Sequence, residues 1–316
     1  PGGLADRRCP DRAATGRGSS GYAASVTTTR DRLSIAFSPC PNDTFVFHAL
    51  VHGLIPDTPP FDVTYADVDV TNTAAMDGRF DIVKVSYAAL PWLLDRYDLL
   101  PCGGALGRGY GPLVVSRAER RDIGGLHVAV PGERTTAYLL MRLWSAARPP
   151  ARISVVPFAE IMPAVAAGTY DAGLVIHEAR FTYPRHGLTR VVDLGEWWDT
   201  ETRLPIPLGA ILLRKGVGLR GGLLAPATVA GWIRDSVRRA WADPAASRSY
   251  VLAHAQEMDP EVVDAHIGLY VNGFSANLGE EGYAAVNALL GRAAAVGLVP
   301  AVAPLSPPVE PAPSSD

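Results

Sequence analysis

The chain has 316 residues, of which 48% are hydrophobic and 19% are charged, and its formal net charge is −3. That length is sufficient for two compact lobes, and without a basic surplus nothing favours nucleic acid or an anionic membrane as a partner. No stretch reaches the roughly 20 apolar residues of a membrane span, so no membrane insertion is expected. Cys9, Cys40 and Cys102 form no C-x-x-C pair, which predicts a reducing compartment, the cytoplasm, and argues against a disulfide framework or a zinc–thiolate site.

The two ends of the chain differ in composition from the middle. Residues 1–31 are rich in small and charged residues and have no apolar run of the roughly 7–15 residues that a signal peptide needs. We expect them to form a disordered extension. Residues 301–316 are rich in proline and serine and are expected to be a flexible tail.

The first strand leads into a turn that contains two prolines. A strand is predicted at 33–37, followed by residues 38–41 and then by Asn42, Asp43 and Thr44, which are helix-capping residue types. The N–H groups at such a helix start point into the turn, where the helix dipole is positive. The pattern therefore predicts a site for a carboxylate or a phosphate, with an ordinary strand-to-helix turn as the alternative.

The next elements alternate between strand and helix. Strands are predicted at 61–66 and 80–85, and helices at 71–78 and 88–96, which is typical of a parallel sheet with covering helices. A glycine-dense segment follows at 101–112. It lacks the terminal Gly-Lys-Ser/Thr of a phosphate-binding P-loop, so we predict a loop or a crossover between lobes.

Lys84, Val85 and Ser86 lie where the strand at 80–85 ends. Lys84 and Ser86 share one side of an extended chain, because side chains alternate along a strand. Together they are able to hold a carboxylate or a sugar hydroxyl. The alternative is a solvated lysine beside a helix-capping serine.

A second unit repeats the order of the first. Strands are predicted at 112–116, 126–130, 153–158, 171–176 and 190–194, with helices at 137–144 and 159–168. The turn after 126–130 carries Thr135 and Thr136, which are either helix caps or a second anion site. After a strand at 208–213 the pattern is helical from 228 onward. Two such units predict two lobes that close over an anionic ligand.

Histidines are the strongest candidates for chemistry. His177 directly follows the apolar strand at 171–176, which places it at the edge of the cleft as a candidate general base, with a structural hydrogen bond as the alternative. His48 and His52 have metal-ligand spacing on a predicted helix. No neighbouring acid or cysteine completes a site there, so no metal is predicted.

Six segments, in this order along the chain, resemble the 1,4-dihydroxy-6-naphthoate synthases, which are enzymes of the futalosine route to menaquinone. The longest are SPCPNDTF at 38–45 and IHEARFTYP at 176–184. The other four are KVSY at 84–87, GGALGRG at 103–109, the segment at 130–138 with its paired threonines, and LPIPLG at 204–209. The resemblance covers about 32–300.

The resemblance implies an α/β fold of the type 2 periplasmic-binding-protein-like class, with a central cleft between two α/β lobes. Residues 32–115 and 206–300 would form the first lobe and 116–205 the second. It also implies a small-molecule carboxylate substrate, cyclic dehypoxanthine futalosine, which a carbon–carbon lyase converts to 1,4-dihydroxy-6-naphthoate. His177 matches the proton acceptor of the family, and its substrate-binding positions match Lys84, Val85, Ser86, Thr135 and Thr136. To these we add Asn42, Asp43 and Thr44 from the first turn.

The resemblance implies no metal and no organic cofactor. The sequence leaves the oligomeric state open, including whether the chain forms a homodimer. Two other functions compete. A chorismate dehydratase of the same pathway would accept chorismate and would lack the His177 segment. A non-catalytic solute-binding protein of the same fold would be expected to carry an export signal or a lipoprotein cysteine motif.

Overall fold

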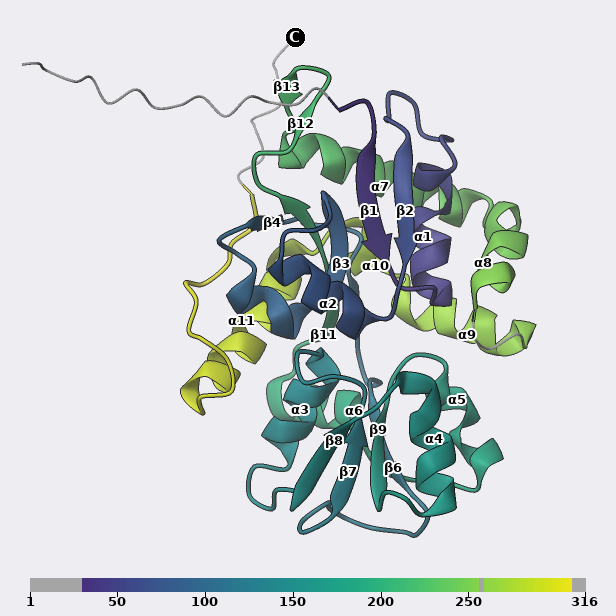
Figure 1. The fold of residues 1–316 in the computed structure, drawn as a ribbon, viewed down its shortest axis with the longest axis vertical. Helices are drawn as coiled ribbons and strands as arrows, with labels where there is room; N and C mark the ends of the chain where they lie inside the picture. The colour runs from purple at the N-terminus through teal and green to yellow at the C-terminus, as the bar shows by residue number, and fades with distance from the viewer. Residues whose placement is uncertain (1–29, 256–258, 309–316) are drawn as a thin grey trace, which may run out of the picture.

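The computed structural model of the chain describes residues 30–255 and 259–308. Most of the predicted extension, 1–29, and the last part of the predicted tail, 309–316, lie outside the described residues. Figure 1 shows two α/β lobes stacked along the long axis of the molecule. None of the helices in the described ranges is long and apolar enough to cross a membrane.

The first lobe is built on a mixed sheet with the strand order β2-β1-β3-β11-β4, and β5 pairs with β11. β1 is parallel to both β2 and β3, as the strand–helix alternation predicted, whereas β11 runs antiparallel between β3 and β4. The strands are β1 (Leu33–Phe37), β2 (Phe61–Tyr65), β3 (Ile82–Ser86), β4 (Tyr97–Leu99), β5 (Ala105–Gly107) and β11 (Ile206–Arg214).

Helices cover this sheet, and its apolar core lies beneath them. Phe37 of β1 stacks on Phe47 of α1 with ring centres 4.7 Å apart, and Ile233 of α7 belongs to the same buried cluster. The helical elements are α1 (Pro41–Val51), α2 (Val68–Met76), η1 (Tyr87–Trp92), α7 (Pro226–Ala242), η3 (Pro244–Ser247), α8 (Arg248–His254), α9 (Pro260–Tyr270), α10 (Gly273–Ala276) and α11 (Gly279–Ala295), and the short strands β12 (Gly218–Leu219) and β13 (Gly222–Leu223) form a hairpin.

The predicted helix at 88–96 is wrong in type and length. The structure has a 3₁₀ helix, η1, which contains Pro91 and ends at Trp92, and β4 follows. Pro91 has no backbone N–H to donate and its ring crowds the preceding turn, which disfavours an α-helix through this segment.

The second lobe has its own mixed sheet, with the strand order β10-β6-β9-β7-β8. β7 is parallel to β8 and β9, while β6 is antiparallel to β9 and β10. Its elements are β6 (Leu113–Ser116), β7 (His127–Val130), α3 (Thr136–Trp144), β8 (Arg152–Val155), α4 (Phe158–Ala167), β9 (Ala172–Val175), α5 (Ala179–Thr182), η2 (Tyr183–His186), β10 (Thr189–Asp193) and α6 (Leu194–Thr202).

The chain crosses between the sheets twice. It leaves the first sheet after β5 and enters the second at β6, then returns from α6 to β11. The glycine-dense segment at 101–112 therefore includes the first crossing, as predicted, but it also includes the strand β5, which the sequence did not predict. Figure 1 shows β11 reaching from the first lobe toward the second.

Residues 301–308 run along α11. The side chain of Asn287 donates to the carbonyl of Leu305 over 2.8 Å and accepts from its N–H, also over 2.8 Å. Val302 and Leu305 pack against a large apolar cluster that includes residues of both lobes. This part of the predicted tail is therefore held to the core by two hydrogen bonds and apolar contacts.

Candidate active site

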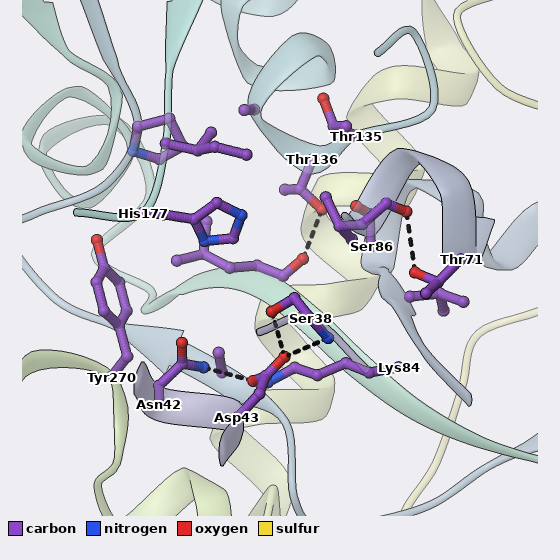
Figure 2. A pocket seen from close by; sticks show the side chains of 18 of the residues that line it. Ser38, Asn42, Asp43, Thr71, Lys84, Ser86, Thr135, Thr136, His177 and Tyr270 are labelled. Atoms are coloured by element: carbon purple, nitrogen blue, oxygen red, sulfur yellow. Dashed lines mark hydrogen bonds and ion pairs between the residues drawn. The ribbon is translucent and has the colours of Figure 1, made fainter. Parts of the chain in front are cut away.

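A pocket of about 690 Å³, measured to its open mouth, lies between the two lobes. Figure 2 shows the ring of His177 between Thr136 on one side and Asn42 and Asp43 on the other. The polar residues of its wall are Ser38, Asn42, Asp43, Thr71, Lys84, Ser86, Thr135, Thr136, His177, His266 and Tyr270.

The structure brings together eight of the nine predicted site residues. Asn42, Asp43, Lys84, Val85, Ser86, Thr135, Thr136 and His177 all line the pocket. Thr44 does not belong to its wall. The Thr44 side chain is fully buried, and its hydroxyl donates to the carbonyl of Cys40 over 3.0 Å inside the first turn of α1.

The prediction that Asn42, Asp43 and Thr44 cap α1 is wrong. The N-cap is Cys40, which makes no side-chain cap, and the helix begins at Pro41. Proline suits the first helical position because its φ is fixed near the helical value and its missing N–H would have no partner there.

Asp43 turns back toward the preceding strand instead. Its carboxylate accepts from the Ser38 hydroxyl over 2.7 Å and from the Asn42 amide over 2.7 Å, and it pairs with the ammonium of Lys84. The side chains of Asp43 and Lys84 are only 3% and 8% exposed. The anion at this helix start is therefore a carboxylate of the chain itself, and it neutralises Lys84.

Asn72, which was not predicted from the sequence, holds the end of β3 by side-chain hydrogen bonds. Its amide oxygen accepts from the N–H of Ser86 over 2.8 Å. Its amide nitrogen donates to the Ser86 hydroxyl and to the carbonyl of Arg134, each over 3.2 Å. One fully buried side chain thus joins the first lobe to the turn before α3. A lone asparagine in a short helix carries no sequence signal for this role.

The hydroxyls of Thr135 and Thr136 have different hydrogen-bond partners. The Thr135 hydroxyl caps α3: it accepts from the N–H of Tyr138 over 3.1 Å and donates to the carbonyl of Gly132 over 2.8 Å. The Thr136 hydroxyl donates to the carbonyl of Leu208 over 2.9 Å and accepts from the N–H of Ala88 over 3.2 Å. The predicted cap is therefore confirmed at Thr135, whereas Thr136 ties the lobes together at the start of α3.

His177 has an unusual backbone. Its φ of 52° lies in the left-handed region, which costs a non-glycine residue roughly 1–2 kcal/mol and is enriched at functional sites. The ring meets Phe158 edge-on, with centres 5.5 Å apart. Burial lowers the pKa of His177 to about 4, against the opposing pull of the Asp43 and Asp67 charges. The imidazole is consequently neutral at pH 7 and able to accept a proton.

Arg180 holds the segment that carries His177. Its guanidinium donates to the carbonyl of Gly111 over 2.7 Å and to the carboxylate of Asp193 over 3.0 Å. Gly111 lies in the first crossing, and Asp193 caps α6 ahead of the second crossing. The histidine segment is thereby fixed to both connections between the lobes.

Two further wall residues, His266 and Tyr270, come from α9 and were missed. Their rings are 4.7 Å apart, and the ring of His266 is 6.4 Å from that of His177. The sequence around them reads as an ordinary helix, and the contact with Asn42 joins residues 224 positions apart. Only the tertiary fold brings this helix to the pocket.

One group of side chains has the composition of a metal site. Ligand atoms of Cys40, His177 and Glu178 lie within 4.8 Å of one another. Burial raises the pKa of the Cys40 thiol well above its usual value, and the charges of Glu178 and Asp43 add to the rise. Metals bind the thiolate, whereas these surroundings favour the neutral thiol.

The histidine pair that the sequence pattern singled out packs ring against ring. The centres of His48 and His52 are 4.6 Å apart. Within residues 30–255 and 259–308, no third histidine, cysteine or acidic ligand atom joins the pair.

Comparison with known proteins identifies the family of the chain. A family model described as "Menaquinone biosynthesis" matches residues 33–295. The chain is 60% identical over 279 residues to a 1,4-dihydroxy-6-naphthoate synthase from Streptomyces coelicolor, covering 87% of this chain and 97% of the relative. It is 49% identical over 268 residues to an enzyme of the same name from Thermus thermophilus, covering 85% and 96% of the two chains.

Solved structures define the fold. A crystal structure of a protein from Archaeoglobus fulgidus matches with a TM-score of 0.78 and 31% identity, over 85% of this chain and 99% of that one. The alkanesulfonate-binding protein of Xanthomonas axonopodis pv. citri matches with a TM-score of 0.64 and 16% identity, over 87% and 96%. These likenesses confirm the periplasmic-binding-protein-like fold. The family match and the two enzyme relatives show that the chain belongs to the menaquinone biosynthesis family and, within it, to the enzymes called 1,4-dihydroxy-6-naphthoate synthases.

Proposed function

We propose that the chain is a carbon–carbon lyase that converts cyclic dehypoxanthine futalosine to 1,4-dihydroxy-6-naphthoate, with His177 as the general base. The observation that carries this proposal is the neutral imidazole of His177, held in a left-handed conformation at the end of β9 against the pocket between the lobes. The names of the relatives that are 60% and 49% identical support the product.

The proposed chemistry is an elimination. The substrate carries a benzoate-type carboxylate and a ring fused to a sugar-derived fragment. His177 takes a carbon-bound proton, and the electron pair of that C–H bond forms a new π bond in the ring system. A ring carbon–carbon bond breaks, and its electron pair leaves with the fragment, which takes up a proton. Aromatisation to the naphthalene diol drives the reaction. A positioned base contributes about 10²–10⁴-fold to the rate, and lobe closure adds orientation and excludes water.

The charges of the pocket favour one position for the substrate carboxylate. The turn at Ser38 is already occupied by the carboxylate of Asp43, which accepts from the Ser38 hydroxyl and neutralises Lys84, so little positive charge remains there for a second anion. The start of α3, at Thr136 and Ala137, lies in the wall at the positive end of a nine-residue helix. We therefore assign the substrate carboxylate to the α3 side and the hydroxyl-bearing part to the side of Asn42 and Asp43.

The same proposal places the reaction in the cytoplasm. Cys40 and Cys102 are both free and buried thiols, which is typical of proteins in a reducing compartment. The biosynthetic names of the relatives agree with that location.

Two parallel incubations test the proposed function. The purified protein is incubated with cyclic dehypoxanthine futalosine and, separately, with chorismate, and the products are followed by chromatography. Formation of 1,4-dihydroxy-6-naphthoate from the first substrate alone is the expected result. Conversion of chorismate would identify a dehydratase instead, and tight binding without conversion of either compound would identify a binding protein.

A further inference from the structure

His266 on α9 has no role in the proposed chemistry, yet it is one of the most deeply buried polar residues of the pocket wall. It is 1% exposed and lines the pocket beside Tyr270. Helix α9 begins at Pro260, far along the chain from every segment that carries the family resemblance. A buried polar ring at a ligand pocket needs partners for both of its nitrogens.

One ring nitrogen of His266 has a partner that also fixes its proton. Nε2 lies 2.9 Å from Oδ1 of Asn42. The Asn42 amide nitrogen donates to the Asp43 carboxylate over 2.7 Å, so the atom that faces the histidine is the amide oxygen, an acceptor. Nε2 must therefore carry the hydrogen and donate it. Asp43 sets the direction of this series of hydrogen bonds, because its carboxylate can only accept hydrogen bonds. The same carboxylate pairs with Lys84.

The charge state of the ring follows from its surroundings. Burial lowers the pKa of His266 well below its ordinary value, and a proton on His177 and the charges of Lys84 and Arg180 act in the same direction. The ring is neutral at pH 7. A neutral imidazole with its hydrogen on Nε2 has an unshared electron pair on Nδ1, so Nδ1 is an acceptor.

That acceptor has no hydrogen-bond partner among the residues that the structure describes. It is buried by the protein itself, so a donor reaches it only when the side chains around the ring shift. A buried acceptor without a partner destabilises the folded state, and such groups are rare in native proteins. The group that completes it must donate a hydrogen bond. A carboxylate or a ketone oxygen cannot do so, whereas a hydroxyl can.

We propose that Nδ1 of His266 accepts a hydrogen bond from a hydroxyl group on the sugar-derived part of the substrate, which makes His266 a substrate-binding and specificity-determining residue. This inference rests on the proposed function, because it takes the substrate from it. It also agrees with the side of the pocket to which the hydroxyl-bearing part was assigned, since His266 bonds directly to Asn42.

A matched pair of variants separates the two nitrogens. In His266→Gln, the side-chain amide nitrogen replaces Nε2 and still donates to Asn42, but no atom replaces Nδ1. In His266→Asn, the amide oxygen replaces Nδ1 as an acceptor, and the contact with Asn42 is lost. The expected result is a loss of about tenfold in kcat/KM for His266→Gln, as for one hydrogen bond, and a smaller loss for His266→Asn. Equal losses, a larger loss in His266→Asn, or no loss in His266→Gln would overturn the inference.

Substrate analogues provide a second, independent measurement. In each analogue one hydroxyl is replaced by hydrogen, and binding to the wild-type protein and to the folded variants is measured by calorimetry. One analogue should bind the wild type about tenfold more weakly than the substrate does, and that difference should vanish in His266→Gln. If no analogue shows this dependence, the inference is wrong even if His266→Gln fails to fold.

The design also separates this inference from the proposed function. If wild-type protein forms no 1,4-dihydroxy-6-naphthoate, the proposed function fails and this inference fails with it. If the wild type turns over normally and only the His266 results disagree, the proposed function stands. A His266 variant could instead shift the pH profile of kcat/KM while binding the analogues with the same relative affinities as the wild type does. That result would assign His266 to proton transfer and would also overturn the inference.

Discussion

The rings of His177 and His266 face one pocket from opposite lobes, with their centres 6.4 Å apart and their planes tilted by 46°. His177 comes from the end of β9 and His266 from α9. Each lies in surroundings that favour the neutral ring, chiefly because of burial. A proton on one ring raises the cost of a proton on the other, so the pair is suited to hold one proton at a time.

The first prediction concerns the pH dependence of activity. A general base acts in its unprotonated form, and burial lowers the pKa of His177 to about 4. We therefore expect kcat/KM to be flat from about pH 5 to pH 8 and to fall about tenfold per unit below pH 4. The measurement is a pH–rate profile of the free enzyme. A fall centred near the ordinary histidine pKa of about 6.5 would contradict the burial argument.

Stability changes over part of the same range and needs its own control. The pKa of His177 is lower in the folded protein than in the unfolded chain, so between about pH 6.5 and pH 4 the unfolded chain binds a proton that the folded protein does not. The contribution of His177 to the free energy of unfolding is present above that range and is lost as the pH falls through it. Circular dichroism at each pH separates loss of folding from loss of activity, and His177→Asn should show a weaker decline in stability.

The second prediction concerns the buried ion pair of Lys84 and Asp43. Removing one partner of a buried pair leaves an uncompensated charge, which typically destabilises a protein by about 3–5 kcal/mol. We expect a loss of that order in Lys84→Met, measured as the free energy of unfolding in urea. The double variant Lys84→Met with Asp43→Asn should recover most of it. If Lys84→Met lowers the free energy of unfolding by less than about 1 kcal/mol, the hydrogen bonds from Ser38 and Asn42 are sufficient to stabilise the buried Asp43 carboxylate.

The third prediction compares the neighbouring threonines. Thr136→Val removes the hydroxyl that bonds to Leu208 and Ala88, leaving buried backbone groups without partners, and should cost about 1–3 kcal/mol. Thr136→Ser keeps the hydroxyl and should cost much less. Thr135→Ala removes a helix cap and should cost about 1 kcal/mol.

The same threonine variants separate a lobe contact from a helix cap. Because Thr136 joins the two lobes, Thr136→Val should also raise the KM for the substrate, whereas Thr135→Ala should act mainly on stability. Urea unfolding and steady-state kinetics on the same preparations make the comparison. Equal effects of the two variants on KM would show that the Thr136 hydroxyl does not control lobe closure.

The sequence was sufficient for features that depend on local patterns. The strand that precedes His177, the capping of α3 by Thr135 and the turn between β1 and α1 all follow from residue order within about ten positions. The arrangement of the side chains around the turn does not. Asp43 pairs with Lys84, 41 positions later, so its type alone suggested a helix cap.

The remainder of the site depends on contacts across the fold. Thr136 bonds to a carbonyl 72 positions away, and His266 bonds to an asparagine 224 positions away. The α9 helix shows only ordinary helical periodicity, and nothing in its sequence distinguishes its two pocket residues, His266 and Tyr270, from core residues. Such long-range partners are fixed by the packing of the two sheets and are not expressed in any local pattern.

The most direct test of the central claim is to compare binding and turnover in His177→Ala. The variant removes the proposed base and leaves the other pocket side chains in place. We expect a dissociation constant for cyclic dehypoxanthine futalosine within about tenfold of the wild-type value, and a kcat lower by at least about 100-fold, the smallest usual contribution of a general base. Turnover close to the wild-type rate in the folded variant would contradict the assignment of His177 as the base.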